Sequence, residues 1–248
     1  TAPERTLILG WNWRAPAIIN ELDQYVPAGS AVTVVAEDDG AAAMLEERCA
    51  DLRHQTIHFQ AGDTTDRRTL DALDIPSYQH VILLCYSEQF DVQQADARTL
   101  ITLLHLRDIA RLHGDAFSIV SEMLDSRNRN LAEITQADDF IVSDRLVSLM
   151  LAQVAENKAL NAVFADLFDP EGAEVYLRPA SQYVRTGQAI DFYTVVEAAR
   201  RRGEVAIGYR RAGFSLDKAR AYGVVVNPNK AEAVTFAAED MVIVLAEG

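Results

Sequence analysis

The sequence has 248 residues, 49% of them hydrophobic and 24% charged, which is the balance of a soluble globular protein with one large or two modest domains. Its 37 acidic and 23 basic residues give a net charge of −14, which argues against nucleic acid or an anionic membrane surface as a partner. Two cysteines, Cys49 and Cys85, are too few for a disulfide framework and indicate a reducing compartment.

The first part of the chain alternates short apolar runs with helical patterns. Strand patterns occur at 6–9, 31–36, 54–60, 80–86, 117–120 and 140–143. Helical spacing of apolar residues separates them, most clearly in a long amphipathic pattern at 92–112, and a further helix is predicted at 127–135. This alternation predicts parallel βαβ units and a doubly wound, Rossmann-like α/β sheet.

The pattern changes at residue 144. Residues 145–168 predict one or two helices without strands between them, and Pro170–Gly172 break the run. Short strands follow at 174–178, 204–209, 223–226 and 241–246, with one helix at 192–201. We therefore expect a Rossmann-like lobe at 1–143, crossover helices at 144–170 and a small α+β lobe at 171–248.

The segment Gly10–Ala15, with the sequence GWNWRA, stands where a dinucleotide-binding fold carries G-x-G-x-x-G. Gly10 fits the tight turn, but Asn12 replaces the glycine that lets the backbone approach a pyrophosphate. We expect Trp11 and Trp13 to add bulk at the mouth of the crevice. The loop therefore predicts that NAD or ATP binds weakly or not at all.

Two interpretations of this loop stay open. In one, the helix N-terminus still offers N–H groups to an anion and Arg14 contacts the phosphate. In the other, the nucleotide site has decayed and Arg14 forms a surface ion pair. Glu37, at the end of the second strand, is placed to hold a ribose hydroxyl. The pair Gly62 and Asp63 follows the third strand and forms either a wall of an adenosine pocket or a cap for the 66–73 helix or the turn before it.

A second candidate site lies in an acidic stretch, where Asp138, Asp139 and Asp144 are candidate ligands of a hard cation such as Ca²⁺. The spacing lacks the regular oxygen ligands of an EF-hand, so a solvated acidic surface is the alternative. His54 and His58 share a strand face, as two exposed histidines or as part of a metal site.

The sequence offers no catalytic constellation. It shows no Ser-His-Asp arrangement, P-loop or nucleophile elbow, and Cys85 is expected to be a buried structural cysteine. These patterns favour a regulatory protein over an enzyme.

The layout of a Rossmann-like lobe, a crossing helix and a small α+β tail resembles the RCK (regulator of K⁺ conductance) module. Four strings are more specific, because they resemble the Castor/Pollux ion channel family, as does the Gly10-Trp11 start: ADDFIVSD at 137–144, LMLAQVAEN at 149–157, EVAIGY at 204–209 and NPNK at 227–230.

The resemblance implies a non-catalytic gating-ring module that controls a potassium or other cation channel through a ligand-linked conformational change. It implies self-association through 145–168, as a homodimer or larger ring, and a membrane pore domain, either fused upstream or separate, with this chain at the cytoplasmic face. Calcium gating in plant members of the family adds Ca²⁺ as a ligand. The alternatives are an NAD-dependent oxidoreductase and a soluble nucleotide-sensing subunit on the same fold.

Overall fold

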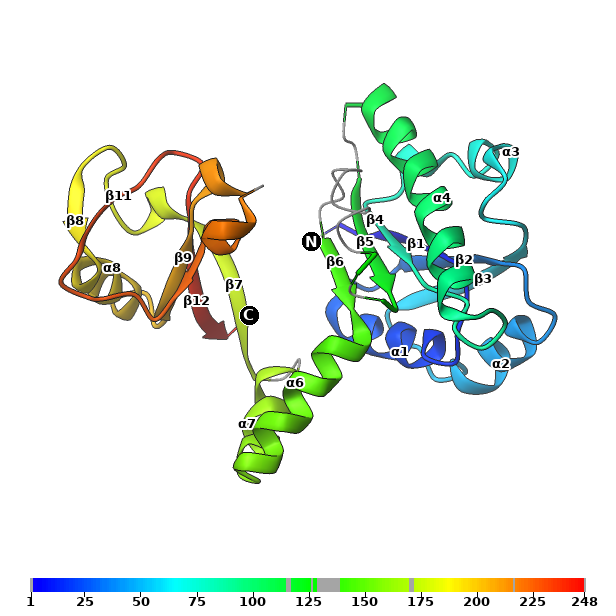
Figure 1. Ribbon diagram of the computed structural model, residues 1–248, viewed down its shortest axis with the longest axis horizontal. Helices are drawn as coiled ribbons and strands as arrows, with labels where there is room; N and C mark the ends of the chain where they lie inside the picture. The colour runs from blue at the N-terminus through cyan, green and yellow to red at the C-terminus, as the bar shows by residue number, and fades with distance from the viewer. Residues whose placement is uncertain are drawn as a thin grey trace. The chain divides into compact units, whose positions relative to one another are not determined.

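The computed structural model describes residues 2–114, 117–125, 127–128, 139–169, 172–215 and 217–247, with backbone only for 139–144 and 218. The chain forms two compact units, residues 1–156 and 157–248 (Figure 1). The three-part division expected from the sequence stays a prediction, and the helix expected at 127–135 lies almost entirely outside the described residues.

The first unit is built on a parallel sheet of six strands in the order β3-β2-β1-β4-β5-β6. The strands are β1 (Arg5–Leu9), β2 (Ser30–Ala36), β3 (Gln55–Ala61), β4 (His80–Leu83), β5 (Ser118–Met123) and β6 (Asp139–Val142). This strand order confirms the doubly wound α/β fold expected from the sequence. The order reverses between β1 and β4, so the carboxyl ends of these two strands border the crevice in which such folds bind ligands.

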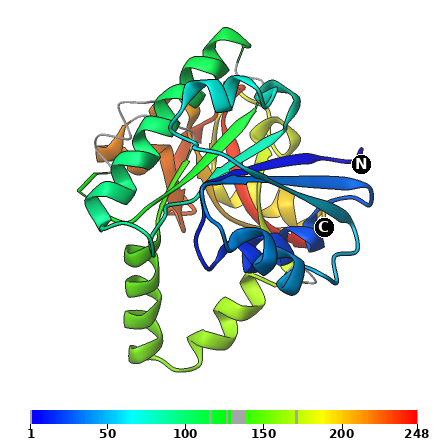
Figure 2. The ribbon, with the colours of Figure 1, turned by 90° about the vertical axis from the view of Figure 1, so that its right-hand side faces the viewer.

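Helices cover both faces of this sheet (Figure 2). They are α1 (Ala15–Tyr25), α2 (Ala41–Arg48), α3 (Arg67–Asp71), the short η1 (Ile75–Ser77) and α4 (Val92–Leu112). Along β1, Leu7 and Leu9 join a core cluster with α3 and α4, whereas Ile8 joins a second cluster with α1 and α2. A strand buried on both faces reads as a continuous apolar run, which explains why the short strands were visible in the sequence.

Helix α6 (Ser143–Glu156) follows β6 without a loop. Several of its apolar side chains are exposed, including Leu149 at 56% and Leu151 at 65%. None of the helices in the described part of the chain is both long enough and apolar enough to cross a membrane.

The second unit contains an antiparallel sheet in the order β10-β9-β12-β7 and a two-stranded sheet of β8 and β11. Its elements are α7 (Leu160–Leu167), β7 (Ala173–Pro179), η2 (Ala180–Gln182), β8 (Ala189–Asp191), α8 (Phe192–Arg200), β9 (Val205–Arg210), η3 (Ala212–Phe214), η4 (Lys218–Gly223), β10 (Val224–Val226), β11 (Ala233–Thr235) and β12 (Met241–Glu247). Phe192 and Val195 of α8 pack with Val242 and Val244 of β12, so α8 covers one face of the larger sheet (Figure 1). The small α+β lobe is confirmed, although β8 and β11 were not expected.

Candidate functional site

The loop after β1 makes a turn that only glycine fits. Gly10 has φ +90°, and a Cβ added there would lie 2.1 Å from the carbonyl oxygen of Leu84. Its N–H donates to Val35 O at 3.0 Å, which ties the turn to β2. The first glycine of the dinucleotide motif therefore keeps its backbone role in this chain.

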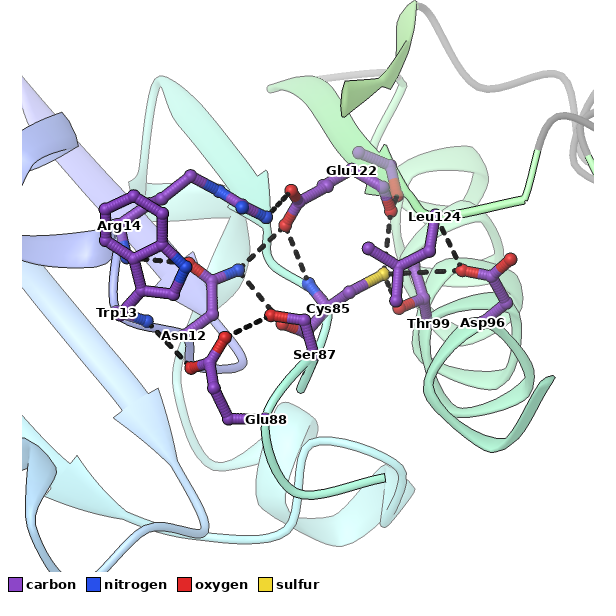
Figure 3. Close-up of polar contacts among 11 residues, drawn as sticks. Asn12, Trp13, Arg14, Cys85, Ser87, Glu88, Asp96, Thr99, Glu122 and Leu124 are labelled. Atoms are coloured by element: carbon purple, nitrogen blue, oxygen red, sulfur yellow. Dashed lines mark hydrogen bonds and ion pairs between the residues drawn. The ribbon is translucent and has the colours of Figure 1, made fainter. Parts of the chain in front are cut away.

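Asn12 fills the place of the second glycine with a fully buried side chain. Its Nδ2 donates to Cys85 O at 3.0 Å and to Glu122 Oε2 at 2.8 Å, and its Oδ1 accepts from Arg14 N at 3.0 Å (Figure 3). Buried amides are stable only when such partners are present. Asn12 therefore links the loop after β1 to the ends of β4 and β5.

Glu122 on β5 is the acceptor at the centre of this network. Besides Asn12, its carboxylate accepts from Cys85 N at 3.2 Å and pairs with the Arg14 guanidinium (Figure 3). Arg14 also lies against the Trp13 ring, with 5.5 Å from Cζ to the ring centre. Arg14 was expected either to contact a phosphate or to form an ion pair, and in the structure it forms an ion pair with Glu122.

The N–H groups that would bind a phosphate at the start of α1 are already engaged. Trp13 N donates to Glu88 Oε2 at 2.9 Å, Arg14 N donates to Asn12, and Ala15 N donates to Asn12 O at 3.0 Å. Pro16 has no N–H. Two carboxylates, from Glu88 and Glu122, thus contact the loop where an anion would be required, and this arrangement does not fit a pyrophosphate.

The opposite side of the crevice is closed by Arg98 of α4. Its Nη2 lies 2.9 Å from Glu37 Oε2 and 2.9 Å from Asp63 Oδ1, and its guanidinium stacks near the rings of Tyr86 and Phe90. A ribose that hydrogen-bonded to Glu37 would have to compete with Arg98 for that carboxylate.

Asp63 stabilises the turn that leads to α3. Its Oδ1 accepts from Thr65 N at 2.9 Å and from Thr65 Oγ1 at 2.7 Å, whereas Asp66 is the N-cap of α3. Burial raises the pKa of Asp63, but the Thr65 hydrogen bonds and the nearby Arg98 charge outweigh burial and leave the pKa below its ordinary value. Gly62 is constrained as well, because an added Cβ would lie 3.0 Å from Thr69 Cγ2.

Cys85 and Asp96 extend the network behind Glu122. The Cys85 Sγ lies 3.0 Å from Thr99 Oγ1 and 3.6 Å from Asp96 Oδ1, and burial raises the pKa of the Cys85 thiol far above its ordinary range. Because the thiolate is the nucleophilic form, this is a structural cysteine. Asp96 accepts from Leu124 N, Asp125 N and Asn128 Nδ2 at 2.8 to 3.0 Å, which anchors the segment after β5 to α4.

The structure brings most of the predicted nucleotide-site residues to one crevice, with one correction. Trp11 is 5% exposed and packs in the core of the α1 and α2 side, so only Trp13, at 57%, adds exposed bulk at the loop. Trp11 packs in the cluster that contains Ile8, Ala15 and Ile19, so the turn at Gly10 does not continue the alternation of β1. A role in cofactor binding for Gly10, Trp11, Asn12, Arg14, Glu37, Gly62 and Asp63 stays a prediction.

Sequence reasoning missed four charged residues in and behind the crevice, which are Glu88, Asp96, Arg98 and Glu122. Asp96 could have been noticed in the sequence, because it is an acid on the buried face of α4 that contains Leu103 and Leu106. Nothing in the sequence marks Glu122, because a single acidic residue near the end of a strand is common at protein surfaces.

The side chains of the three predicted cation ligands lie outside the described part of the structure. Asp138 lies outside the described residues, and only the backbone of Asp139 and Asp144 is described. His54 precedes β3, with Nδ1 2.6 Å from Asp23 O, and His58 lies within β3. In the described ranges, no three His, Cys, Asp or Glu side chains gather as a metal cluster.

A Rossmann-like unit followed by a small α+β unit is the fold found in a solved gating ring. No family model matches the chain. Among solved structures, the human SLO3 gating ring matches with a TM-score of 0.65 over 99% of this chain and 44% of that chain, at 12% identity. At that identity the likeness shows the fold alone.

The relatives are more specific. The chain is 30% identical over 99% of its length to the probable ion channel CASTOR of Oryza sativa subsp. japonica, and 31% identical over 92% to the ion channel CASTOR of Lotus japonicus. It is also 30% identical over 99% to the ion channel DMI1 of Medicago truncatula. The chain is therefore homologous over its whole length to the CASTOR, POLLUX and DMI1 ion channels. It spans about a third of the length of these relatives, at 31% and 30% of the two CASTOR sequences.

We predict that Asn12→Ala destabilises the first unit by about 1–3 kcal/mol, because Cys85 O and the Glu122 carboxylate lose a buried donor. Gln24→Ala is the control, since Gln24 is exposed on α1, the helix that follows the Asn12 loop. Urea unfolding followed by circular dichroism measures the difference. Equal midpoints for the two variants would show that Asn12 is not a structural link.

Proposed function

We propose that this chain is a non-catalytic regulatory module of a cation channel, which acts by a ligand-linked conformational change within an assembly of identical modules. The observation that carries the proposal is the homology to ion channels over the whole chain, joined to a crevice filled by the protein's own side chains. The membrane pore, at whose cytoplasmic face the module would sit, and the choice of potassium or another cation are part of this proposal.

An NAD-dependent oxidoreductase is the less favoured function. Such an enzyme needs an open glycine loop and reactive groups near the nicotinamide, whereas here Asn12 closes the loop and Cys85 is a buried, protonated thiol. A soluble nucleotide-sensing subunit faces the same closed loop. Turnover of NADH with candidate carbonyl substrates would support the oxidoreductase instead.

The pairing of β5 with β6 supports a coupling between the crevice and α6. Glu122 is opposite Ile141 in the pairing of β5 with β6, and α6 begins at Ser143, two residues further on. A ligand or partner that binds better to one arrangement of this sheet edge shifts the population of α6 positions by its differential affinity. A gating module requires a coupling of this kind.

We predict that neither NADH nor ATP binds tightly. The phosphate-binding N–H groups are engaged by Glu88 and Asn12, and Arg98 holds Glu37. Isothermal titration calorimetry should show no dissociation constant below about 1 mM. A low-micromolar constant for either nucleotide, lost in Arg14→Ala, would contradict the filled crevice and restore a nucleotide-sensing role.

We predict that Ca²⁺ stabilises the protein through Asp138, Asp139 and Asp144. A ligand that binds only the native state stabilises it, by about 2.7 kcal/mol at 100 times its dissociation constant. Millimolar Ca²⁺ should therefore raise the melting temperature, and substitution of the three aspartates by Asn should remove the increase. Asp51→Asn, at an exposed site elsewhere, is the control. A melting temperature that Ca²⁺ does not move would argue against a preformed site.

We predict that the chain self-associates through 145–168. The apolar residues Leu149 and Val163 are 56% and 49% exposed, and Phe164 is only half-buried. A helix with apolar residues over a wide arc needs cover on more than one side. Light scattering at micromolar concentration should give more than the 27.4 kDa of one chain, and Leu149→Asp with Phe164→Asp should reduce the assembly. A monomer at all concentrations would refute self-association.

A further inference from the structure

A groove in the second unit is lined by charged and aromatic side chains that the proposed function does not use. One side is formed by residues from Asp191, the N-cap of α8, to Arg202, just beyond the end of that helix. Gln182 and Tyr183, at the end of η2, also line the groove, which has a volume of about 650 Å³. Pockets that bind small organic ligands measure roughly 300–1,000 Å³, so the groove has the size of such a site.

Arg202 is held in this groove by long contacts. Among the described residues, its Nη2 lies 3.4 Å from Gln182 Oε1 and its Nε lies 3.6 Å from Glu204 Oε1, whereas charge-assisted hydrogen bonds measure about 2.7–2.9 Å. The Tyr183 ring lies 5.3 Å from Arg202 Cζ and positions the guanidinium by a cation–π contact. Because a guanidinium has five N–H donors in a planar fork, Arg202 can still bind an oxyanion through two of them.

Two guanidinium groups share the single carboxylate of Glu204 behind the groove. Glu204 is buried, and Arg178 Nε lies 3.5 Å from Oε1, the same atom that Arg202 approaches. Tyr183 donates its hydroxyl to Oε2 at 2.5 Å, and burial together with Glu204 raises the pKa of Tyr183 to about 12, so this phenol stays protonated at neutral pH. Two cations and one anion leave one positive charge uncompensated.

The other charged groups that line the groove are paired within the protein. Glu197 accepts from Arg200 Nε at 2.8 Å and from Arg201 Nε at 3.0 Å. Asp191 accepts from a backbone N–H as the N-cap of α8. The uncompensated charge therefore lies at the Arg202 end of the groove.

The end of α8 is compatible with an anion. Free carbonyl groups at a helix C-terminus disfavour a nearby negative charge. Here the carbonyls of Glu197, Ala199 and Arg200 accept backbone N–H groups from residues 201–204. These hydrogen bonds reduce the repulsion that an anion beside Arg202 would meet.

The groove also offers apolar surface. Tyr193 is 61% exposed, and Ala198 lies between Tyr193 and Arg202 along the chain. The separation of Tyr193 from Arg202 corresponds to about 13 Å along a helix. A tyrosine ring presents a flat apolar surface to a ligand, so the groove combines an oxyanion contact at one end with apolar contacts along its length.

We propose that this groove binds a small organic monocarboxylate, with its carboxylate on Arg202 and an apolar or aromatic body against Tyr193 and Ala198. One negative charge matches the one uncompensated positive charge, whereas a phosphate monoester would bring about two negative charges close to Glu197 and Glu204. This binding needs neither a membrane pore nor an assembly of chains, so it goes beyond the proposed function and is tested separately from it.

An NMR titration of the ¹⁵N-labelled full chain tests the proposal, with the Ala198 backbone amide and the Gln182 side-chain amide as reporters. The probe is 4-phenylbutanoate, and its uncharged analogue 4-phenylbutanamide is the matched control ligand. Millimolar 4-phenylbutanoate should shift both signals to saturation. It should bind at least tenfold more tightly than the amide, because only the carboxylate forms charge-assisted hydrogen bonds, and phenyl phosphate should bind more weakly than 4-phenylbutanoate.

Variants locate the two contacts. Arg202→Gln should weaken 4-phenylbutanoate binding at least tenfold, and Arg202→Lys, which keeps the charge but loses the planar fork, should weaken it less. Tyr193→Ala should weaken binding of the carboxylate and the amide alike, because it removes an apolar contact. Arg185→Gln, at an exposed arginine that does not line the groove, should change binding less than twofold. Each variant should keep the circular dichroism spectrum of the parent chain.

Four results would overturn the proposal. They are no shift of the reporter signals in millimolar 4-phenylbutanoate, equal affinities for the carboxylate and the amide, tighter binding of phenyl phosphate, and an Arg202→Gln variant that binds like the parent chain. Each of them leaves the proposed function standing, because that function is tested by Ca²⁺ binding and by self-association through 145–168.

Discussion

The hydrogen bond between Asn12 and Glu122 is the constraint on which the rest of the first unit depends. It joins the loop after β1 to the end of β5 across the point where the strand order reverses. In a dinucleotide-binding fold this point receives the pyrophosphate, and there the backbone must be bare. Here an amide and a carboxylate satisfy each other, so the chain supplies from within what a cofactor would otherwise supply. The Arg98 bridge between Glu37 and Asp63 does the same on the ribose side.

The side chains that close the crevice also connect it to the edge of the sheet. Asp96 anchors the segment after β5, Glu122 connects β5 to the loop after β1, and β6 passes directly into α6. The network is continuous from the centre of the sheet to its edge, where the crossover helix begins. Cores of this kind are close-packed and switch between discrete arrangements more readily than they deform. The proposed regulatory role requires such an arrangement, whereas an enzyme needs an open site.

The fold was predictable because its signals are local. The buried parallel strands are apolar runs, α4 occupies the full 92–112 pattern, and the break at Pro170–Gly172 precedes the change to the second unit. The three-residue strands β8 and β11 were missed because runs so short have no periodicity. The strand expected at 80–86 ends at Leu83, although Leu84 N still donates to Leu9 O at 2.9 Å. The poor fit of the loop after β1 to a pyrophosphate was predictable from Asn12. The residues that occupy the crevice were not predictable, since Glu122 and Arg98 are distant from Asn12 in sequence and only the fold brings them together.

The central claim is that the Asn12 side chain is held inside the crevice by the protein itself. The most direct measurement is an NMR spectrum of the side-chain amide groups of ¹⁵N-labelled protein, with the Asn12 signals assigned from Asn12→Ala. The account predicts two resolved Asn12 protons that are protected from exchange with water and that do not shift in millimolar NADH or ATP. Rapid exchange of these protons, or a shift when a nucleotide is added, would show that the crevice is open and would contradict the account.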